Sequence, residues 1–307
     1  MKKIIVLGAS GMLGHKVFEV LSTNDQYQVI GTVTSKKSFA GTLPQKYENN
    51  IVENIFADTI DSIKQLLVSE KPEVVINCIG VIKQNESSKD VENCIILNAL
   101  FPHQVARICR EIGARFITIA TDCVFDGQKG ESYHDDDLPT CHDVYGMSKY
   151  LGEVKEENSL TLRTSIIGHE LHSNLSLLDW FLSQTTATIK GYDRAIFSGF
   201  TTLEFAKLLA EKIIPMEKLH GLYQISVNPI SKYELLKIVA KVYQKNSSLE
   251  PDSTLNINRS LNSDKLRAII GYMPPSWEQL IQEMHQDFLQ SDFYQAKRTQ
   301  YGLQNHF

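Results

Sequence analysis

The sequence predicts an α/β fold, with a doubly wound parallel sheet (a Rossmann arrangement) and a smaller, helix-rich C-terminal domain. Short aliphatic runs alternate with helical patterns through the first half of the chain, which is typical of parallel strands joined by helices. Three glycines separate the first aliphatic run from the first helix. The 307 residues also exceed what one hydrophobic core usually supports, so we expect one large or two coupled domains.

The composition narrows the classes of function. Apolar residues make up 42% of the chain and charged residues 22%, as in soluble globular proteins, and the net charge of −5 argues against a nucleic-acid or anionic-membrane partner. The five cysteines are odd in number and contain no Cys-x-x-Cys, which indicates reduced thiols in a cytoplasmic protein. No segment approaches the ~18–20 apolar residues of a membrane span, and the first apolar run stops at Gly8, too early for a signal peptide.

The first motif is a glycine-rich turn between a strand at residues 3–7 and a helix that extends to about Leu21. Gly8 permits the tight turn, Gly11 lets the backbone approach a pyrophosphate, and Gly14 lets the helix pack closely on the strand. The helix N-terminus then offers free N–H groups to phosphates. We therefore predict dinucleotide binding here. The other loop residues expected to line this site are Ser10, Met12 and Leu13.

The next strand, residues 28–34, bears on the choice of cofactor. An NAD site usually places an acid near the end of this strand to bind the ribose 2′-hydroxyl. Here the tip of the strand and the loop after it contain hydroxyls and lysines, including Thr34, Lys36 and Lys37, which suit a 2′-phosphate. We therefore favour NADP(H) over NAD(H), with a solvated basic loop as the alternative.

The alternation of strand and helix continues to the middle of the chain. Ligands of such sheets bind beyond the carboxyl ends of the strands, where Asp58, Gly80 and Thr121 also stand. Pro102 predicts an internal break in the longest helix. The further elements expected are strands at 51–57, 73–79 and 116–120 and helices at 60–68 and 93–112.

The candidate chemistry lies just beyond the fifth strand. Tyr145 and Lys149 are four residues apart, so they share one face of a helix. A nearby ammonium lowers the pKa of a phenol, ordinarily about 10, which makes Tyr145 a candidate proton donor to an oxygen that gains negative charge. Thr121 would donate a hydrogen bond to a substrate carbonyl, and Lys149 could also hold a cofactor ribose. The alternative is a surface Lys beside a half-buried Tyr, because such pairs are common.

The ordered set of motifs resembles the extended short-chain dehydrogenase/reductases, and most closely their dTDP-4-dehydrorhamnose reductase branch. The matching segments are residues 8–14, Thr121-Asp-Cys-Val-Phe-Asp-Gly127 and Tyr145-Gly-Met-Ser-Lys-Tyr-Leu-Gly-Glu153, with looser matches at 162–168 and 201–206. The resemblance implies reduction of the 4-keto group of a dTDP- or UDP-linked 6-deoxy sugar with NADPH or NADH, in the synthesis of activated sugars for cell-surface polysaccharides.

The resemblance also implies roles for single residues. Thr121, Tyr145 and Lys149 would be catalytic. Asp58 would accept a hydrogen bond from the adenine amino group, and Asn77 and Gly80 would line the cofactor site, as would Tyr145 and Lys149. Asp58 could instead cap a helix that starts near Thr59, and Asn77 could be a strand-end hydrogen-bonding residue.

The sequence departs from the family pattern beside the substrate. Cys123 stands where the family commonly has Tyr, so the identity of the sugar is not determined. Related dehydratases have Glu at this position, so Cys123 argues against a dehydratase. A sugar-nucleotide epimerase and a non-catalytic NADP-binding regulatory subunit are the alternatives. The residues expected on the substrate side are Asp122, Cys123, Ser165 and Arg194. Arg194 would bind the diphosphate, with a salt bridge to Asp193 as the alternative.

The histidines have no metal-ligand spacing, so no metal site is expected. The acidic run at 135–137 is interpreted as a solvated loop.

The second half of the sequence predicts a helix-rich, substrate-binding cap over the cofactor domain. Residues 190–200 are expected to form a loop, the strand at 222–225 to return to the sheet, and the tail from Ser291 onward has no clear period. We therefore assign residues 1–167 to the dinucleotide-binding domain, with 200–226 returning to it, and 168–307 mainly to the substrate cap. A homodimer is the assembly considered, although no pattern fixes the oligomeric state.

Overall fold

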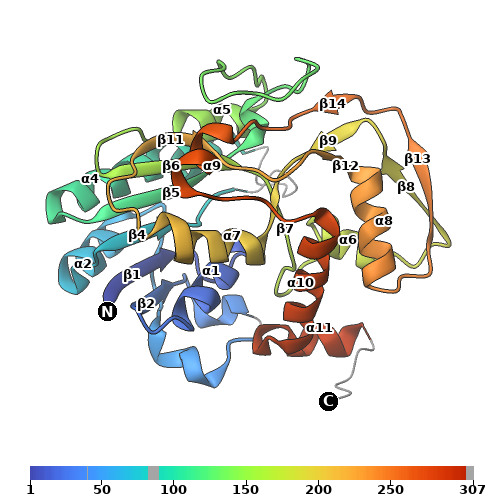
Figure 1. Ribbon diagram of the computed structural model, residues 1–307. Coiled ribbons are helices and arrows are strands. Elements are labelled where there is room, and N and C mark those ends of the chain that lie inside the picture. Colours follow the sequence, from blue (N-terminus) through green and yellow to red (C-terminus); the bar gives the residue numbers. More distant parts are fainter. Residues whose placement is uncertain (40, 82–89, 302–307) are drawn as a thin grey trace.

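A seven-stranded parallel sheet forms the centre of the protein in the computed structural model, which describes residues 1–39, 41–81 and 90–301 (Figure 1). The strands are β1 (Lys2–Leu7), β2 (Tyr27–Thr32), β3 (Ile51–Val52), β4 (Val74–Asn77), β5 (Arg115–Thr121), β6 (Ser159–Thr164) and β11 (Gly221–Gln224). Their order is β11-β6-β5-β4-β1-β2-β3, and every neighbouring pair is parallel. The doubly wound fold predicted from the sequence is confirmed, and the strand expected at 222–225 does join this sheet.

Helices cover both faces of this sheet. Alternate residues of β1 enter different cores: Ile4 and Val6 pack in the core that contains α1 and α7, whereas Ile5 and Leu7 pack in the core that contains α2 and α4. Because both faces are covered, the strands read as continuous aliphatic runs. The bounds of these helices and of α5 are α1 (Met12–Ser22), α2 (Ile60–Glu70), α4 (Phe101–Ile112), α5 (Val144–Leu151) and α7 (Thr202–Leu208).

Apart from α9 (Asp264–Ile270), which contacts β11, the remaining elements lie mostly to one side of this sheet in Figure 1, and we call them the second body. Its small sheets pair β7 (Ile166–Ile167) with β10 (Phe200–Thr201), β8 (Thr188–Tyr192) with β13 (Ser248–Asp252), and β9 (Ala195–Phe197) with β12 (Ile230–Ser231) and β14 (Ile257–Asn258). Its helices are α6 (Leu177–Ser183), α8 (Lys232–Val242), α10 (Trp277–Gln290) and α11 (Gln295–Gln300).

Two elements differ from the sequence prediction. Residues 190–200, expected to be a loop, contain the end of β8 and all of β9, because partners distant in the sequence supply their hydrogen bonds. The strand expected at 51–57 is only β3, since the chain leaves the sheet after Val52.

The long helix expected at 93–112 is interrupted, as Pro102 predicted. It consists of α3 (Val91–Cys94), a π-helical segment (Ile95–Leu100) and α4. Pro102 has no N–H to give to the carbonyl four residues earlier, which is that of Asn98. Gly152 packs directly against this carbonyl, so closely that any side chain there would collide with it.

Three helices in the second half begin at a hydroxyl side chain that caps the N-terminus. Thr201, Ser231 and Ser276 each accept a hydrogen bond from the backbone N–H three residues later, at the N-termini of α7, α8 and α10. The Glu204 carboxylate, in the first turn of α7, accepts a hydrogen bond from the Tyr272 hydroxyl at 2.8 Å. Within the described ranges, no helix combines the length and apolarity needed to cross a membrane.

Candidate active site

The glycine-rich turn has the geometry that its sequence predicts. Gly8 has a φ of +81°, and a Cβ at Gly14 would lie 2.0 Å from the Gly8 carbonyl oxygen, so both positions require glycine. Gly11 is exposed at the N-cap of α1, where it provides no capping side chain. The first amide groups of the helix, which include those of Met12 and Leu13, are therefore left for an anion. Ser10 lies half-buried in the same turn.

The loop after β2 contains an acid that the sequence reasoning missed. Thr34 is exposed, and Lys36 begins a 3₁₀ turn, Lys36–Phe39. The Lys36 backbone N–H donates to the carboxylate of Glu53 at 2.5 Å. Glu53 lies after β3, so it reaches the tip of β2 only through the parallel pairing of the two strands.

Asp58 and Asn77 lie at the ends of neighbouring segments but in different environments. Asp58 is exposed, and the N-cap of α2 falls on Thr59, so Asp58 is not the cap residue. Asn77 is buried at the end of β4. Its amide donates to the Thr118 hydroxyl at 3.2 Å, and its carbonyl oxygen accepts from the Ile79 N–H at 3.0 Å.

Lys149 lies at the carboxyl end of β4. A Cβ added to Gly80 would be 2.4 Å from the Lys149 Nζ, so the ammonium lies directly against this glycine. Burial lowers the pKa of Lys149 to about 8, and the neighbouring thiols of Cys78 and Cys94 act in the opposite direction. The ammonium is therefore held in a site that hydrates it poorly.

Thr121 and Tyr145 meet at the end of the adjacent strand, β5. Their two hydroxyls lie close enough for Thr121 to oppose the rise in the Tyr145 pKa. The Thr121 Oγ1 also accepts from the Cys123 N–H at 3.1 Å and lies 3.2 Å from an Asp122 carboxylate oxygen, to which it donates. Helix α5 begins with Asp143 as its N-cap, which accepts from the Gly146 N–H, and this cap fixes the first turn on which Tyr145 lies.

The pKa of Tyr145 differs from the sequence expectation. Burial raises it, negative charge on Cys123 and Asp122 raises it further, and the neighbouring Thr121 hydroxyl opposes them. The expectation that Lys149 would lower this pKa overlooked the cost of placing a phenolate in a poorly hydrated site. Tyr145 is therefore protonated at neutral pH, as a proton donor must be.

Asn98 is a further polar residue in this site, and the sequence reasoning did not identify it. It is buried in the π-helical segment, where its carbonyl oxygen accepts from the Val81 N–H at 2.9 Å and its amide donates to the Ser148 hydroxyl at 3.2 Å. Asn98 therefore connects Val81, in the segment after β4, to Ser148 of α5. Ser148 lies between Tyr145 and Lys149 in the sequence. The one feature of the sequence that could have indicated Asn98 is a single amide side chain within an apolar helical run.

The substrate-side residues fall into two groups. Asp122, which is buried, and Cys123 lie directly against Thr121 and Tyr145. Burial raises the pKa of Asp122, while Arg259 favours its charged form. Arg259 follows β14, donates to the Phe125 carbonyl at 2.7 Å and lies 3.8 Å from the Cys123 sulfur.

Ser165 and Arg194 lie farther along the chain. Ser165 is half-buried just after β6, and its carbonyl accepts from the Phe200 N–H. Arg194 is exposed in the turn between β8 and β9. Arg259, rather than Arg194, contacts Cys123 with its guanidinium, and the sequence reasoning did not single it out.

The acidic run after Tyr133 is not simply solvated, which corrects the sequence interpretation. The Asp135 carboxylate accepts from the Gln224 N–H at 2.6 Å, and the His134 carbonyl accepts from the Gln224 side chain at 2.8 Å. Asp137 accepts from the His134 N–H and pairs with Lys129. These bonds tie the loop to the edge strand β11. Among the described residues, no cluster of three or more His, Cys, Asp or Glu side chains could hold a metal ion.

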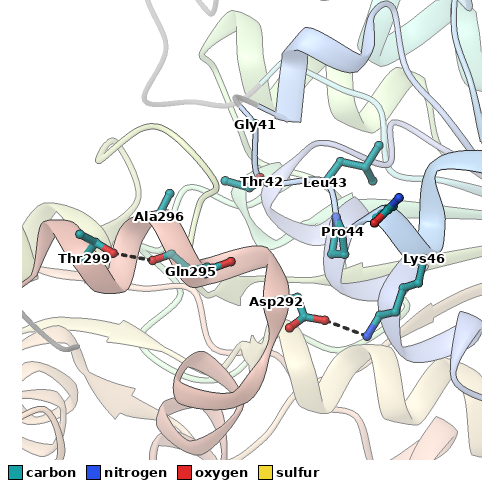
Figure 2. A pocket seen from close by; sticks show the side chains of 10 residues that line it. Gly41, Thr42, Leu43, Pro44, Lys46, Asp292, Gln295, Ala296 and Thr299 are labelled. Carbon is teal, nitrogen blue, oxygen red and sulfur yellow. Dashed lines mark hydrogen bonds and ion pairs between the residues drawn. The ribbon is translucent and has the colours of Figure 1, made fainter. Parts of the chain in front are cut away.

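A large surface cavity lies elsewhere, between residues 41–46 and the C-terminal helix α11 (Figure 2). Its volume is about 550 Å³, and the exposed ion pair between Lys46 and Asp292 closes one side at 2.9 Å. The residues described above do not line it. The cavity therefore marks the edge of a contact between the C-terminal segment and the first domain rather than the place of the chemistry.

The fold and the site together define a dinucleotide-binding protein of the extended short-chain dehydrogenase/reductase type. The chain belongs to the family described as RmlD substrate binding domain, whose model matches residues 1–290. It is 23% identical to a dTDP-4-dehydrorhamnose reductase of Aggregatibacter actinomycetemcomitans, over 92% of this chain and 98% of that protein. It is also 24% identical to the methionine adenosyltransferase 2 subunit beta of Xenopus laevis, over 80% of this chain and 74% of that protein.

Among solved structures, the fold is similar to that of a dTDP-4-dehydrorhamnose reductase from Bacillus anthracis in complex with NADP. The TM-score is 0.77 at 22% identity, and the match covers 94% of this chain and 99% of that chain. The family resemblance inferred from the motifs is thereby confirmed.

Proposed function

We propose that the chain is an NADP(H)-dependent oxidoreductase that reduces the 4-keto group of a nucleotide-linked 6-deoxy sugar, in the supply of activated sugars for cell-surface polysaccharides. The observation that carries the proposal is the convergence of Thr121, Tyr145 and Lys149 at adjacent strand ends, beside a glycine-rich turn, in a chain of this family. The Aggregatibacter relative is named for this activity.

The residues of the turn suit the phosphates of a dinucleotide. Gly11 is exposed, and a side chain there would meet only the Gly8 carbonyl, at 3.5 Å, so the backbone is open to a close ligand. Met12 and Leu13 would offer their N–H groups, and Lys149 would donate to the ribose. When bound, the reduced nicotinamide supplies a hydride.

The proton and the charge stabilisation come from the protein. Tyr145 donates its proton to the sugar oxygen as the hydride arrives at the carbonyl carbon. Thr121 donates a hydrogen bond to the same oxygen, and removal of one such donor typically costs about 2.7–4 kcal/mol of transition-state stabilisation. The charge of Lys149 favours the tyrosinate that remains, so the ammonium is most useful after the proton has moved.

The two cations of the second body are the candidates for the substrate diphosphate. Arg194 was predicted for this role and is free to be reached from solvent. Arg259 lies closer to the reacting groups, through its contact with Cys123. A guanidinium binds phosphate oxygens in pairs, so either side chain suits the charge of the substrate.

The choice between NADPH and NADH rests on the loop after β2. Lys36 and Lys37 favour a 2′-phosphate, and the Bacillus structure contains NADP. Glu53 adds a carboxylate beside the Lys36 N–H, which opposes a second negative charge there. NADPH is therefore favoured, with a smaller preference over NADH than the lysines alone would give.

A non-catalytic regulatory subunit is the second candidate, because one of the relatives is named as a methionine adenosyltransferase subunit. Such a protein has no need of the three catalytic side chains, whereas this chain has all of them. Turnover separates the two candidates, and an epimerase would show no net consumption of the cofactor.

A homodimer would cover an exposed apolar face. Helix α5 packs beside α3 and the π-helical segment. The exposed apolar side chains on these neighbouring elements are Val91, Ile95, Leu100, Met147, Tyr150 and Leu151. Sedimentation should show a dimer that Leu151→Lys converts to a monomer, and a monomeric wild type would refute this assembly.

The experiment that tests the function follows absorbance at 340 nm with NADPH, then NADH, over a panel of dTDP- and UDP-linked 4-keto-6-deoxy sugars. Stoichiometric loss of signal with one donor establishes the reductase. Tight binding of NADPH without turnover on any donor would contradict the reductase and favour the regulatory subunit.

A further inference from the structure

A buried histidine connects the glycine-rich turn to the C-terminal segment. His15, directly after the third glycine, is fully buried. Its Nδ1 lies 2.8 Å from the Gly11 carbonyl oxygen, and its Nε2 lies 2.8 Å from the hydroxyl of Tyr294, 279 residues away in the sequence. No step of the proposed reaction uses His15 or Tyr294.

The chemistry of the partners fixes the direction of both hydrogen bonds. A carbonyl oxygen can only accept, so the proton of His15 is on Nδ1. Burial lowers the pKa of His15 to about 3, and the neighbouring Lys16 acts in the same direction, so the ring is neutral at working pH. Its Nε2 therefore accepts from the Tyr294 O–H. The chain of bonds runs from Tyr294 through His15 to Gly11.

Tyr294 is itself firmly held. It is 1% exposed, and the Lys16 ammonium lies 4.7 Å from the centre of its ring. Lys16 pairs with Glu19 at 2.5 Å and with Asp287 at 2.6 Å. One residue earlier, Phe293 stacks on Tyr47 of the first domain, with ring centres 5.8 Å apart.

The flanks of this segment are anchored as well. Ser291 donates to the Glu19 carboxylate at 2.7 Å. The Lys297 ammonium, 4% exposed, donates to the Asp179 carboxylate at 2.6 Å and to the carbonyls of Glu170 and Ser173. We call residues 291–301 and the side chains that they contact in α1 and α6 the C-terminal seam.

We propose that Tyr294 is a positioning residue of the dinucleotide site, acting through His15 on the Gly11 carbonyl; this inference rests on the proposed function. The peptide between Gly11 and Met12 is planar and trans, so its C=O and N–H point in opposite directions. Holding the carbonyl inward, against His15, aims the Met12 N–H outward, at the place of the pyrophosphate. The His15 backbone N–H donates to the same carbonyl at 3.0 Å, so the C-terminal seam, acting through the ring, reinforces the orientation of an amide that would bind the cofactor.

The test is Tyr294→Phe, which removes one hydroxyl and preserves the ring. The dissociation constant for NADPH, measured by titration of its fluorescence, should rise about fivefold, as the loss of one net hydrogen bond predicts. The KM for NADPH should rise with it, while kcat at saturating cofactor stays near that of the wild type, because Tyr294 does not touch the reacting atoms.

The matched control is Tyr27→Phe. The Tyr27 hydroxyl is buried and donates to the Ala210 carbonyl at 2.6 Å, at the opposite end of β2 from the cofactor loop. Its loss should lower stability about as much as the loss at Tyr294 but leave NADPH affinity unchanged. Equal weakening in both variants would mean general loosening of the fold and would overturn the proposal.

A double variant tests the route through His15. If Tyr294 acts only through that ring, His15→Ala with Tyr294→Phe should bind NADPH as His15→Ala does alone. Additive losses, or wild-type affinity in Tyr294→Phe, would overturn the proposal and leave the function intact. A wild-type protein that binds neither NADPH nor NADH would instead refute the proposed function itself.

Discussion

The active site and the C-terminal seam each contain a Tyr and a nearby Lys, but the two pairs differ in how their polar atoms are satisfied. In the seam, the Lys297 ammonium meets the Asp179 carboxylate and two carbonyls, and the Tyr294 hydroxyl donates to a neutral ring. In the active site, burial lowers the pKa of Lys149 to about 8 and raises that of Tyr145. A buried charge with full partners supports the fold, whereas a poorly hydrated ammonium at a strand end is ready to meet a ligand.

The largest expected effect tests the active-site side of this comparison. Tyr145→Phe removes the proton donor, so kcat should fall by about 10²–10⁴, the usual contribution of general acid catalysis. NADPH affinity, measured by fluorescence titration, should remain, and so should the midpoint of thermal unfolding. Turnover close to that of the wild type would remove Tyr145 from the mechanism.

The next effect tests the seam. Lys297→Met leaves the Asp179 carboxylate buried without its cation, so the free energy of unfolding should fall by roughly 3–5 kcal/mol. Burial alone would raise the pKa of Asp179, but His169 and Lys297 outweigh it and the pKa is lowered. The stabilisation is therefore present above the ordinary pKa of Asp and is lost as pH falls.

The control for this change lies in the same segment. Lys46→Met breaks the exposed Lys46–Asp292 pair at the rim of the cavity in Figure 2, and should change the free energy of unfolding by only about 0–1 kcal/mol. Urea unfolding of both variants measures the difference. Equal losses would show that the two ion pairs do not differ as their burial indicates.

The last effect, smaller than that of Lys297→Met, has the opposite sign. Lys149→Met replaces a poorly hydrated ammonium, so the variant should be more stable than the wild type at pH 7, by roughly 1–3 kcal/mol. The pKa of Lys149 is about 8 in the folded chain, against an ordinary value of 10.5, so the unfolded state binds more protons between these values. Wild-type stability should therefore rise relative to the variant from pH 8 to 10.5.

Urea unfolding at about pH 7 and at about pH 9.5 checks this prediction, since the two values lie on either side of the lower pKa. Lys64→Met, at an exposed position of α2, is the control and should show no such pH-dependent difference. A loss of stability in Lys149→Met at neutral pH would mean that the ammonium is well satisfied, and the contrast between the two lysines would fail.

The elements that could be predicted from the sequence are those whose signal is local. The aliphatic runs of β1 and β4 are continuous because both faces of the sheet are covered. The caps at Ser231 and Ser276 depend on residues only three positions apart. The spacing of Tyr145 and Lys149 likewise placed them on one short helix.

What could not be predicted depends on distant partners. Strand β8 has a sequence, Thr188–Tyr192, without an aliphatic run, and it becomes a strand only beside β13. Glu53 reaches the β2 loop, and Arg259 reaches Cys123, through pairings that no local pattern encodes. Asn98 needed knowledge of which face of an apolar helix meets the active site.

The bond between His15 and Tyr294 has a consequence for the order of synthesis. The glycine-rich turn and α1 leave the ribosome early, and domains generally begin to fold from the N-terminus. The hydroxyl that completes the His15 network is made 279 residues later. A nascent first domain would therefore hold a dinucleotide more loosely than the finished chain, and the cofactor site would mature only once the C-terminal segment has docked.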